Sequence, residues 1–418
     1  MSTGENVRAL DLWHAALNGR GRFYSVMTGQ DLEKAFREII GQINTSNEGE
    51  TTSTAASGSN ASRYDVGTYT GVYEPLNAWK GYVKAETVNK DGTVTAGWSG
   101  KTTSQLLDAI NVSDRLILSW SDQLVAAGSA SVEKGGVAFK WSTSQSYLST
   151  AQNAKLGLNT TTPLATSGQD VLGYIRGVRT AEAPDGGATS TQPFRKRDSV
   201  QGDIINSGVW YTGAPAGTYA LQGYSSFVRT QKSRTPMIYV GGNDGMLHGF
   251  SATDGAEKIA YVPQGVIASL KDLASPSYNH QYYVDGSPMT GDVELGRVIT
   301  GGSGSFYQPD WRTLLVGTLG AGGKGYFVLD VTNPVTGSAS VAPAFTETNA
   351  SALVKVDRTR ATADVRNCAS FANNSAEKTF CEKAADEEKD IGHITAKPVL
   401  DENDPMRTTQ ITRMNNGR

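Results

Sequence analysis

Residues 234–263 read RTPMIYVGGNDGMLHGFSATDGAEKIAYVP and contain three short apolar runs, at 237–240, 246–252 and 257–262. Each of the two breaks between these runs ends in Asp-Gly. Asp-Gly between apolar runs is a strong hairpin signal, because tight turns need residues that tolerate a positive φ. The stretch therefore predicts a three-stranded antiparallel meander, which must stack on copies of itself or on another layer to bury both faces.

A second stretch repeats this pattern less regularly. Residues 311–334 read WRTLLVGTLGAGGKGYFVLDVTNP, with β-rich runs on either side of a glycine-rich turn. Repeated meanders marked by glycine and aromatic residues are typical of a β-propeller, in which each meander forms a blade. We therefore predict a mainly β fold with a partial β-propeller of quinoprotein-like blades. Segments 202–211 and 390–400 are each predicted to begin a further blade. The segment 264–310, between the two best copies of the pattern, is predicted to be an insertion.

Five segments in chain order carry a family resemblance. They are DLWHAALNGRGRFYS (11–25), the stretch from Arg197 to Trp210, YVGGNDGMLHGFSATDG (239–255), YYVDG (282–286) and 311–334. In this order they resemble the PilC-type type IV pilus assembly and adhesin family, whose members have a C-terminal β-propeller. The resemblance implies export to the pilus tip, the cell surface or the outer membrane. It also implies roles in pilus biogenesis and adhesion, with minor pilins and host or abiotic surfaces as partners.

Composition argues against two other classes of protein. The chain has 418 residues, of which 47 are glycine, and its 38 basic and 41 acidic side chains give a net charge of −3. A nucleic-acid-binding protein needs a basic excess on one face, so no nucleic-acid partner is expected. No run reaches the roughly 20 apolar residues that span a bilayer, so no membrane span is expected.

Neither end of the chain matches a complete exported protein. The N-terminus has no basic segment followed by an apolar one, so a secretory signal peptide is absent. The predicted blades before Arg418 are too few to close a ring. We therefore interpret the sequence as an internal fragment of a longer protein.

The chain divides into four predicted regions. Residues 1–44, with an amphipathic helix at 31–43, are similar to the last unit of a von Willebrand factor A-like domain and lack its Asp-x-Ser-x-Ser metal loop. Residues 45–62 form a Ser/Thr-rich linker that cannot bury enough surface to offset the entropy of ordering. Residues 63–166 are predicted to be a β-rich intermediate domain, and residues 167–418 the N-terminal part of the propeller.

The intermediate domain contains four tryptophans, Trp79, Trp98, Trp120 and Trp141. We interpret them as core residues of a β layer, because aromatic side chains dominate the energetics of core burial. A carbohydrate-binding platform is the alternative. The predicted strands of this region are 66–72, 79–88, 115–120 and 138–141, and a short helix and turn are predicted at 168–178.

The two cysteines, Cys368 and Cys381, are predicted to form a disulfide. In an oxidising compartment a bridge across this short polar loop would contribute about 3 kcal/mol through loop-closure entropy. Two free thiols are the alternative. Two isolated cysteines do not predict zinc, since structural zinc sites need four ligands with paired spacing.

Few residues qualify as a functional site. Asp285 lies in the family-like YYVDG segment and Asp292 follows it, and both are predicted either to cap turns through Asx hydrogen bonds or to face a ligand. Residues 320–325 match G-x-G-x-x-G, but a strand-like run follows instead of a helix, so a hairpin turn is predicted rather than a dinucleotide site. The histidines His14, His248, His280 and His393 are widely separated and are interpreted as structural or surface residues.

Two family features are incomplete in this sequence. Arg176-Gly177-Val178 stands where family members can carry Arg-Gly-Asp, so integrin-type recognition lacks its carboxylate. No segment has the D-x-[DN]-x-[DN]-G spacing of a calcium loop, and Ca²⁺ is expected only in the complete family protein. No catalytic set or cofactor site is evident.

Three classes of function remain open at this point. The first is a non-enzymatic pilus biogenesis factor and pilus-associated adhesin, whose propeller loops bind minor pilins or surfaces. The second is a pyrroloquinoline-quinone-type dehydrogenase, although Cys368 and Cys381 are not adjacent and the blades lack a repeated docking tryptophan. The third is a lectin-like module that uses the tryptophan-rich region.

Overall fold

The structure, a computed structural model, describes residues 50–54, 66–75, 78–89, 93–142, 147–157, 167–217, 219–301, 304–335 and 342–398. The chain divides into two units, 1–49 and 50–418, and every described residue lies in the second unit. The helix predicted at 31–43, and with it the von Willebrand factor A-like remnant at 1–44, lies outside the described residues. Within the described ranges no helix is long and apolar enough to cross a bilayer.

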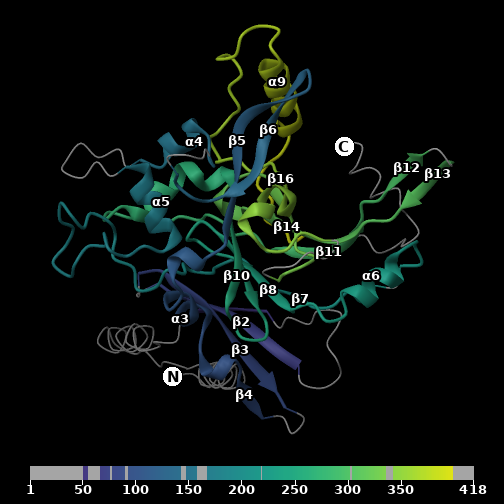
Figure 1. The fold of residues 1–418 in the computed structure, drawn as a ribbon. Helices are drawn as coiled ribbons and strands as arrows, with labels where there is room; N and C mark the ends of the chain where they lie inside the picture. Colours follow the sequence, from purple (N-terminus) through teal and green to yellow (C-terminus); the bar gives the residue numbers. More distant parts are fainter. Residues whose placement is uncertain are drawn as a thin grey trace, which may run out of the picture. The chain divides into compact units, whose positions relative to one another are not determined.

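The meander predicted from residues 234–263 is confirmed. Strands β7 (Trp210–Thr212), β8 (Met237–Gly241), β9 (Leu247–Ser251) and β10 (Glu257–Val262) pair antiparallel in chain order. The turns on either side of β9 contain Gly245 and Gly255, whose φ angles of +92° and +74° explain why Asp-Gly occurs there. All residues of β8 and β9 are buried, so other layers cover both faces of this unit (Figure 1).

A second antiparallel unit follows the first. Strands β11 (Met289–Glu294), β14 (Trp311–Thr318), β15 (Tyr326–Asp330) and β16 (Val354–Asp357) form a four-stranded sheet in that order. The strands predicted within 311–334 are confirmed as β14 and β15. The segment 264–310, predicted to be an insertion, instead supplies the first strand of this sheet, because β11 pairs along its whole length with β14.

The first strands of the two units, β7 and β11, lie next to each other. The indole Nε1 of Trp210 donates to Thr290 Oγ1 at 2.8 Å, and the hydroxyls of Thr212 and Thr290 are 2.9 Å apart. The described residues thus contain two four-stranded meanders arranged as neighbouring blades, as expected for a partial propeller in a mainly β fold.

A long hairpin extends the first blade on its outer side. Strands β5 (Ile117–Ala127) and β6 (Ala130–Ala138) form the hairpin, and β5 pairs parallel with β10, which gives the sheet order β6-β5-β10-β9-β8-β7. This six-stranded sheet joins strands from both sides of the domain boundary predicted at residue 166. The strand predicted at 138–141 is wrong, since β6 ends at Ala138 and the amide of Lys140 turns back to the carbonyl of Ala138.

A third sheet lies N-terminal to the hairpin in sequence. It consists of β1 (Glu50–Thr54), β2 (Val66–Glu74), β3 (Lys80–Val88) and β4 (Val94–Ala96) in chain order. The predicted strands at 66–72 and 79–88 are therefore confirmed. Strand β1 falls inside the predicted linker 45–62, because backbone pairing with the edge of β2 orders a polar strand without a large apolar side chain.

The third sheet packs on the first blade through one apolar cluster. Tyr69 and Val83 of this sheet join Ile238, Val240 and Phe250 of the blade in a continuous buried core. The Tyr69 hydroxyl also donates to the carbonyl of Ala252 at 3.2 Å.

Short helices fill the spaces between the sheets. The helix predicted at 168–178 is confirmed as α5, which begins after a Ser167 cap and ends at Gly177 with φ +119°. Segment 202–211 begins the first blade through β7, whereas 390–398 contains no strand, so that predicted blade start is wrong over these residues. The helices are α3 (Thr103–Asp108), α4 (Thr150–Lys155), α5 (Gly168–Arg176), α6 (Tyr224–Thr230), α7 (Leu270–Ala274), α8 (Ala350–Leu353) and α9 (Ala376–Glu388).

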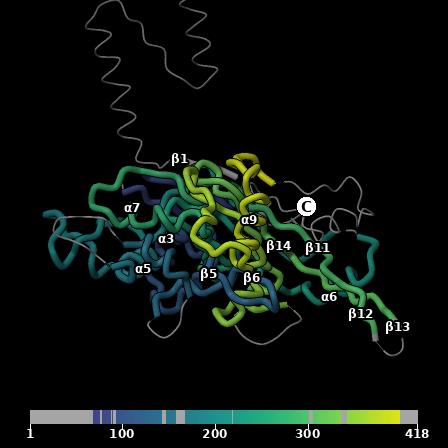
Figure 2. The backbone as a smooth tube through the Cα atoms, turned by 90° about the horizontal axis from the view of Figure 1, so that it is seen from above, coloured from purple at the N-terminus to yellow at the C-terminus, as the bar shows by residue number. Residues whose placement is uncertain are grey.

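A small hairpin is separate from the other sheets. Strands β12 (Arg297–Gly301) and β13 (Gly304–Gln308) pair only with each other among the described strands. Both views show this hairpin projecting from the blades at the end of β11 (Figures 1 and 2).

Candidate functional site

Buried aspartates end the last two strands of the second blade, and one of them bonds to the first blade. Asp330 Oδ1 accepts from the Oγ1 of Thr332 at 2.6 Å, and Asp357 Oδ1 accepts from the Oγ1 of Thr359 at 2.5 Å. The second oxygen of Asp357 accepts from the Tyr261 hydroxyl of the first blade at 2.6 Å. The sequence reasoning missed this pair, although Asp-x-Thr at the end of two successive strands of the second blade, β15 and β16, is a visible signal.

The two aspartates predicted to cap turns or to face a ligand are both engaged inside the protein. Asp285 is 3% exposed, and its carboxylate accepts from the backbone and side-chain amides of Asn206 at 3.1 and 2.7 Å. Asp292 of β11 accepts from the Tyr224 hydroxyl at 2.8 Å and from Thr313 Oγ1 at 2.7 Å. The structure shows no direct contact that brings the two carboxylates together within the described residues, and a ligand-facing role stays a prediction.

A buried charge network surrounds His248 inside the first blade. Its Nδ1 lies 2.8 Å from Glu257 Oε1, and its Nε2 lies 2.9 Å from Asp244 Oδ2. Burial alone would lower the pKa of His248, but the two carboxylates outweigh burial and raise the pKa to about 9. Arg115 and His248 in turn lower the pKa of Glu257 to about 2, against the opposing effect of burial. This enclosed network has a structural role.

A narrow cleft lies between the turn before β3, the segment 195–203 and the loop before β11, and it is a candidate site. Trp79, Gln201, Asp203, Asn243 and Tyr278 are among its lining residues. Asp203 Oδ2 accepts from the Asn243 amide at 2.7 Å and lies 2.8 Å from the Nε2 of His280. The ring of His280 stacks on Trp79 with centroids 3.8 Å apart. His280, interpreted from sequence as structural or surface, therefore positions an aromatic ring in this cleft.

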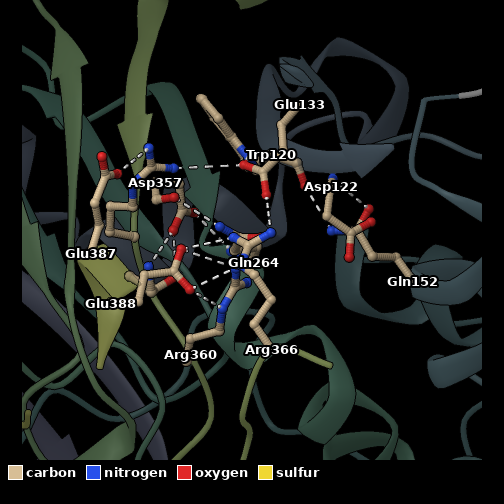
Figure 3. A network of polar contacts seen from close by, with 12 residues as sticks. Trp120, Asp122, Glu133, Gln152, Gln264, Asp357, Arg360, Arg366, Glu387 and Glu388 are labelled. Atoms are coloured by element: carbon tan, nitrogen blue, oxygen red, sulfur yellow. Dashed lines mark hydrogen bonds and ion pairs between the residues drawn. The ribbon is translucent and has the colours of Figure 1, made fainter. Parts of the chain in front are cut away.

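A second polar network joins α9 to the hairpin β5–β6 (Figure 3). Arg366 donates to Glu133 Oε1 at 2.9 Å and to both oxygens of Glu388 at 2.7 and 3.2 Å. Arg360 donates to the same Glu388 carboxylate, and Trp120 Nε1 donates to Glu133 Oε2 at 2.8 Å. Burial would raise the pKa of Glu388, but the two guanidinium groups hold it below its usual value.

The cysteines lie beside this network. Cys368 and Cys381 are bonded with an S–S distance of 1.95 Å, which ties the loop before α9 to the helix itself. Cys381 is 3% exposed, on the buried side of α9.

Two sequence motifs have structural explanations. In the G-x-G-x-x-G segment, a side chain at Gly322 would overlap the carbonyl oxygen of Tyr283, so the glycine serves close backbone packing. Arg176 of the Arg-Gly-Val tripeptide is 7% exposed and donates to the carbonyls of Phe139 and Arg115 at 2.7 and 3.2 Å. It is therefore part of the core and is not presented to a receptor.

Metal coordination finds no support in the described part of the chain. No group of three or more His, Cys, Asp or Glu side chains there could hold a metal ion. His393 bonds the carbonyl of Gly320 through its Nδ1 at 2.8 Å, and His14 lies outside the described residues.

Comparison with known proteins finds one matching family model and several similar proteins. The family described as PilY1 beta-propeller domain matches residues 201–379. The type IV pilus biogenesis factor PilY1 of Pseudomonas aeruginosa strain PAO1 is 34% identical over 354 residues, which cover 80% of this chain and 27% of that protein. A PilY1 homolog of Xylella fastidiosa is 39% identical over 183 residues, which cover 41% of this chain and 14% of the homolog.

One solved structure is also similar in sequence. The crystal structure of the Pseudomonas aeruginosa PilY1 C-terminal domain is 41% identical, over 30% of this chain and 23% of that chain, with a TM-score of 0.21. The chain spans about a quarter of the length of the Pseudomonas proteins that it matches.

Proposed function

We propose that the chain acts in type IV pilus biogenesis, because residues 201–379 match the family described as PilY1 beta-propeller domain and the similar proteins are named type IV pilus biogenesis factors. The proposed role is non-enzymatic and lies outside the cytoplasm, at the pilus tip, the cell surface or the outer membrane. It consists of binding minor pilins during assembly and of presenting loops to host or abiotic surfaces. The names of the relatives support the pilus role, since each is a pilus biogenesis factor.

The hairpin β12–β13 is the observation that carries the proposed binding role. Val298, Phe306 and Tyr307 of this hairpin are 63%, 60% and 37% exposed. A two-stranded hairpin is marginally stable alone in water, and exposed apolar side chains on open strand edges favour docking to another protein. We assign this hairpin as the surface that contacts a minor pilin, with an extended pilin strand added to its edge.

A complementation experiment tests this role. The full-length gene carrying Val298→Ser and Phe306→Ser is returned to a deletion strain, and sheared surface pili are quantified together with twitching. Loss of surface pili at an unchanged level of the protein is expected. The matched control is Val94→Ser, which removes an exposed apolar side chain from β4, 58% exposed, and should leave piliation intact. Normal piliation in the hairpin variant would exclude the hairpin as the contact surface.

The adhesive part of the proposal has its own test. The variant strains that still make pili are compared with the parent for attachment to epithelial cells and to glass. A parent strain that attaches no better than the deletion strain would remove adhesion from the proposed function. A quinone-dependent dye-reduction assay on the purified chain addresses the dehydrogenase alternative, for which no activity is expected. Chelation with EGTA in the same strains tests whether the complete protein needs Ca²⁺.

A further inference from the structure

The cleft beside Trp79 has a strained backbone at its mouth. Ala78 and Trp79 both adopt positive φ angles, of +55° and +58°. Such angles are strained in residues other than glycine and persist where the surroundings hold them. Here Arg195 donates from Nη1 to the carbonyl of Ala78 at 3.2 Å, which helps to fix this turn. The strained turn places a large aromatic side chain at the edge of a cleft, where strain is characteristic of binding sites.

The Trp79 ring packs on His280, which a chain of hydrogen bonds holds in place. His280 stacks on Trp79, bonds Asp203 at 2.8 Å, and Asp203 in turn accepts from the amide of Asn243. The side-chain oxygen of Asn243 accepts from the backbone amide of Tyr283 at 3.0 Å. A ring supported in this way loses little conformational entropy when a ligand packs on it.

Gln201 provides an unused hydrogen-bond donor in the same cleft. Gln201 is 1% exposed, and its side-chain oxygen accepts from Thr103 Oγ1 at 2.8 Å. Its amide nitrogen is buried and has no hydrogen-bond partner among the described residues. A buried amide without a partner is costly in a folded protein, so a bound group that accepts from it would be stabilised.

The charges around the cleft balance each other. The guanidinium groups of Arg195 and Arg197 lie over the rings of Tyr278 and Tyr174, with centroid distances of 4.3 and 3.6 Å. Asp203 and Asp244 also line the cleft and offset these cations. A phosphate or another strong anion therefore finds no excess of positive charge here. The lining instead combines an aromatic ring with planar amide and carboxylate groups.

From this combination we propose that the cleft binds one neutral saccharide unit. One face of a sugar ring carries C–H groups, which can pack on the Trp79 indole. The hydroxyl groups around the edge of the sugar ring can accept a hydrogen bond from the side-chain amide of Gln201. This inference deepens the adhesive part of the proposed function by naming the class of ligand. It does not depend on the hairpin β12–β13.

Binding is measured by NMR on the whole ¹⁵N-labelled chain. The chain has seven tryptophans, and the indole signal of Trp79 is assigned by its loss in Trp79→Phe. Methyl glycosides of glucose, galactose, mannose and N-acetylglucosamine are titrated, and a glycan array extends the search. A selective shift of the Trp79 signal with a dissociation constant of about 1 mM is expected, as for a small ligand with few contacts.

Variants separate a binding role from a structural one. The two Trp79 variants lack the indole signal, so binding by all variants is followed through the backbone amide signals of the cleft residues. Trp79→Ala should weaken saccharide binding about tenfold, Trp79→Phe should restore part of it, and Gln201→Leu should weaken it while the ring remains. The matched control is Trp210→Phe, whose indole bonds Thr290 between the blades, and which should bind normally. Unchanged urea midpoints identify the variants that still fold.

Three results would overturn this proposal. One is the absence of a Trp79 shift with every saccharide tested. Another is unchanged saccharide affinity in Trp79→Ala. The third is a stronger Trp79 shift with an extended peptide than with any sugar, which would assign the cleft to a peptide. None of these results bears on piliation, because saccharide binding is measured on the purified chain. Conversely, the piliation result for the hairpin variant does not test the cleft proposal.

Discussion

Replacing Arg366 with alanine removes the centre of the network that holds α9 against the hairpin β5–β6 (Figure 3). The arginine makes three hydrogen bonds to two carboxylates, at 2.7 and 3.2 Å to Glu388 and at 2.9 Å to Glu133. The side chains of Glu133 and Glu388 are 2% and 8% exposed, so water replaces the lost partner only in part.

The expected loss in free energy of unfolding is about 3 kcal/mol, the lower end of the 3–5 kcal/mol that follows when one partner of a buried ion pair is removed. The lower end applies because Glu388 keeps Arg360, and Glu133 keeps the Trp120 indole. Urea unfolding followed by tryptophan fluorescence measures this loss, and Trp120 reports on the network directly.

A control and a double-mutant cycle make the result decisive. Lys389→Ala removes an exposed ion pair to Asp386 at the end of the same helix and should leave the urea midpoint unchanged. Combining Arg366→Ala with Glu388→Gln should give a coupling free energy of about 2 kcal/mol. If Arg366→Ala behaves like Lys389→Ala, the network contributes nothing to holding α9, and the reasoning from burial is refuted.

Three further outcomes follow from the same structure. The stabilisation by His248, whose pKa is raised to about 9, is fully present below pH 6.5 and is lost as the pH rises through about 9. The free energy of unfolding, measured by urea unfolding between pH 6 and 10, should fall by roughly 3 kcal/mol, and this fall should be absent in His248→Asn. Gly322→Ala should cost about 2 kcal/mol or more in urea unfolding because the new methyl group overlaps a backbone carbonyl, whereas Gly186→Ala, with open space around it, should be neutral. Reducing the disulfide of Cys381 should lower the free energy of unfolding by about 3 kcal/mol, measured with and without a phosphine reductant.

Local patterns in the sequence predicted the local parts of the fold. The Asp-Gly turns identified the meander because Gly245 and Gly255 need positive φ angles, which few other residues adopt. Helix α5 was recognisable because Ser167 caps its start and Gly177 ends it. In each case the residues that decide the structure are neighbours in the chain.

Contacts between distant segments could not be predicted in this way. The parallel pairing of β5 with β10 has no local mark, because both strands carry ordinary β-forming residues. The cleft could not be predicted for the same reason. Trp79 and Gln201 line it, and His280 packs on Trp79, only in the folded chain. His248 has no histidine at a metal-site spacing, so its sequence neighbourhood does not mark the carboxylates of Asp244 and Glu257 that enclose it in the fold.

The parallel pairing of β5 with β10 also bears on the time course of synthesis. Ser119 Oγ donates to the carbonyl of Val262, a contact that spans 143 residues. At a translation rate of about 5–20 residues per second, β5 emerges roughly 7–30 seconds before its partner exists. During that interval the edge of β5 that will pair with β10 offers unpaired backbone groups to any other nascent chain. A holding chaperone is therefore most valuable to this protein early in synthesis, before the first blade has been made.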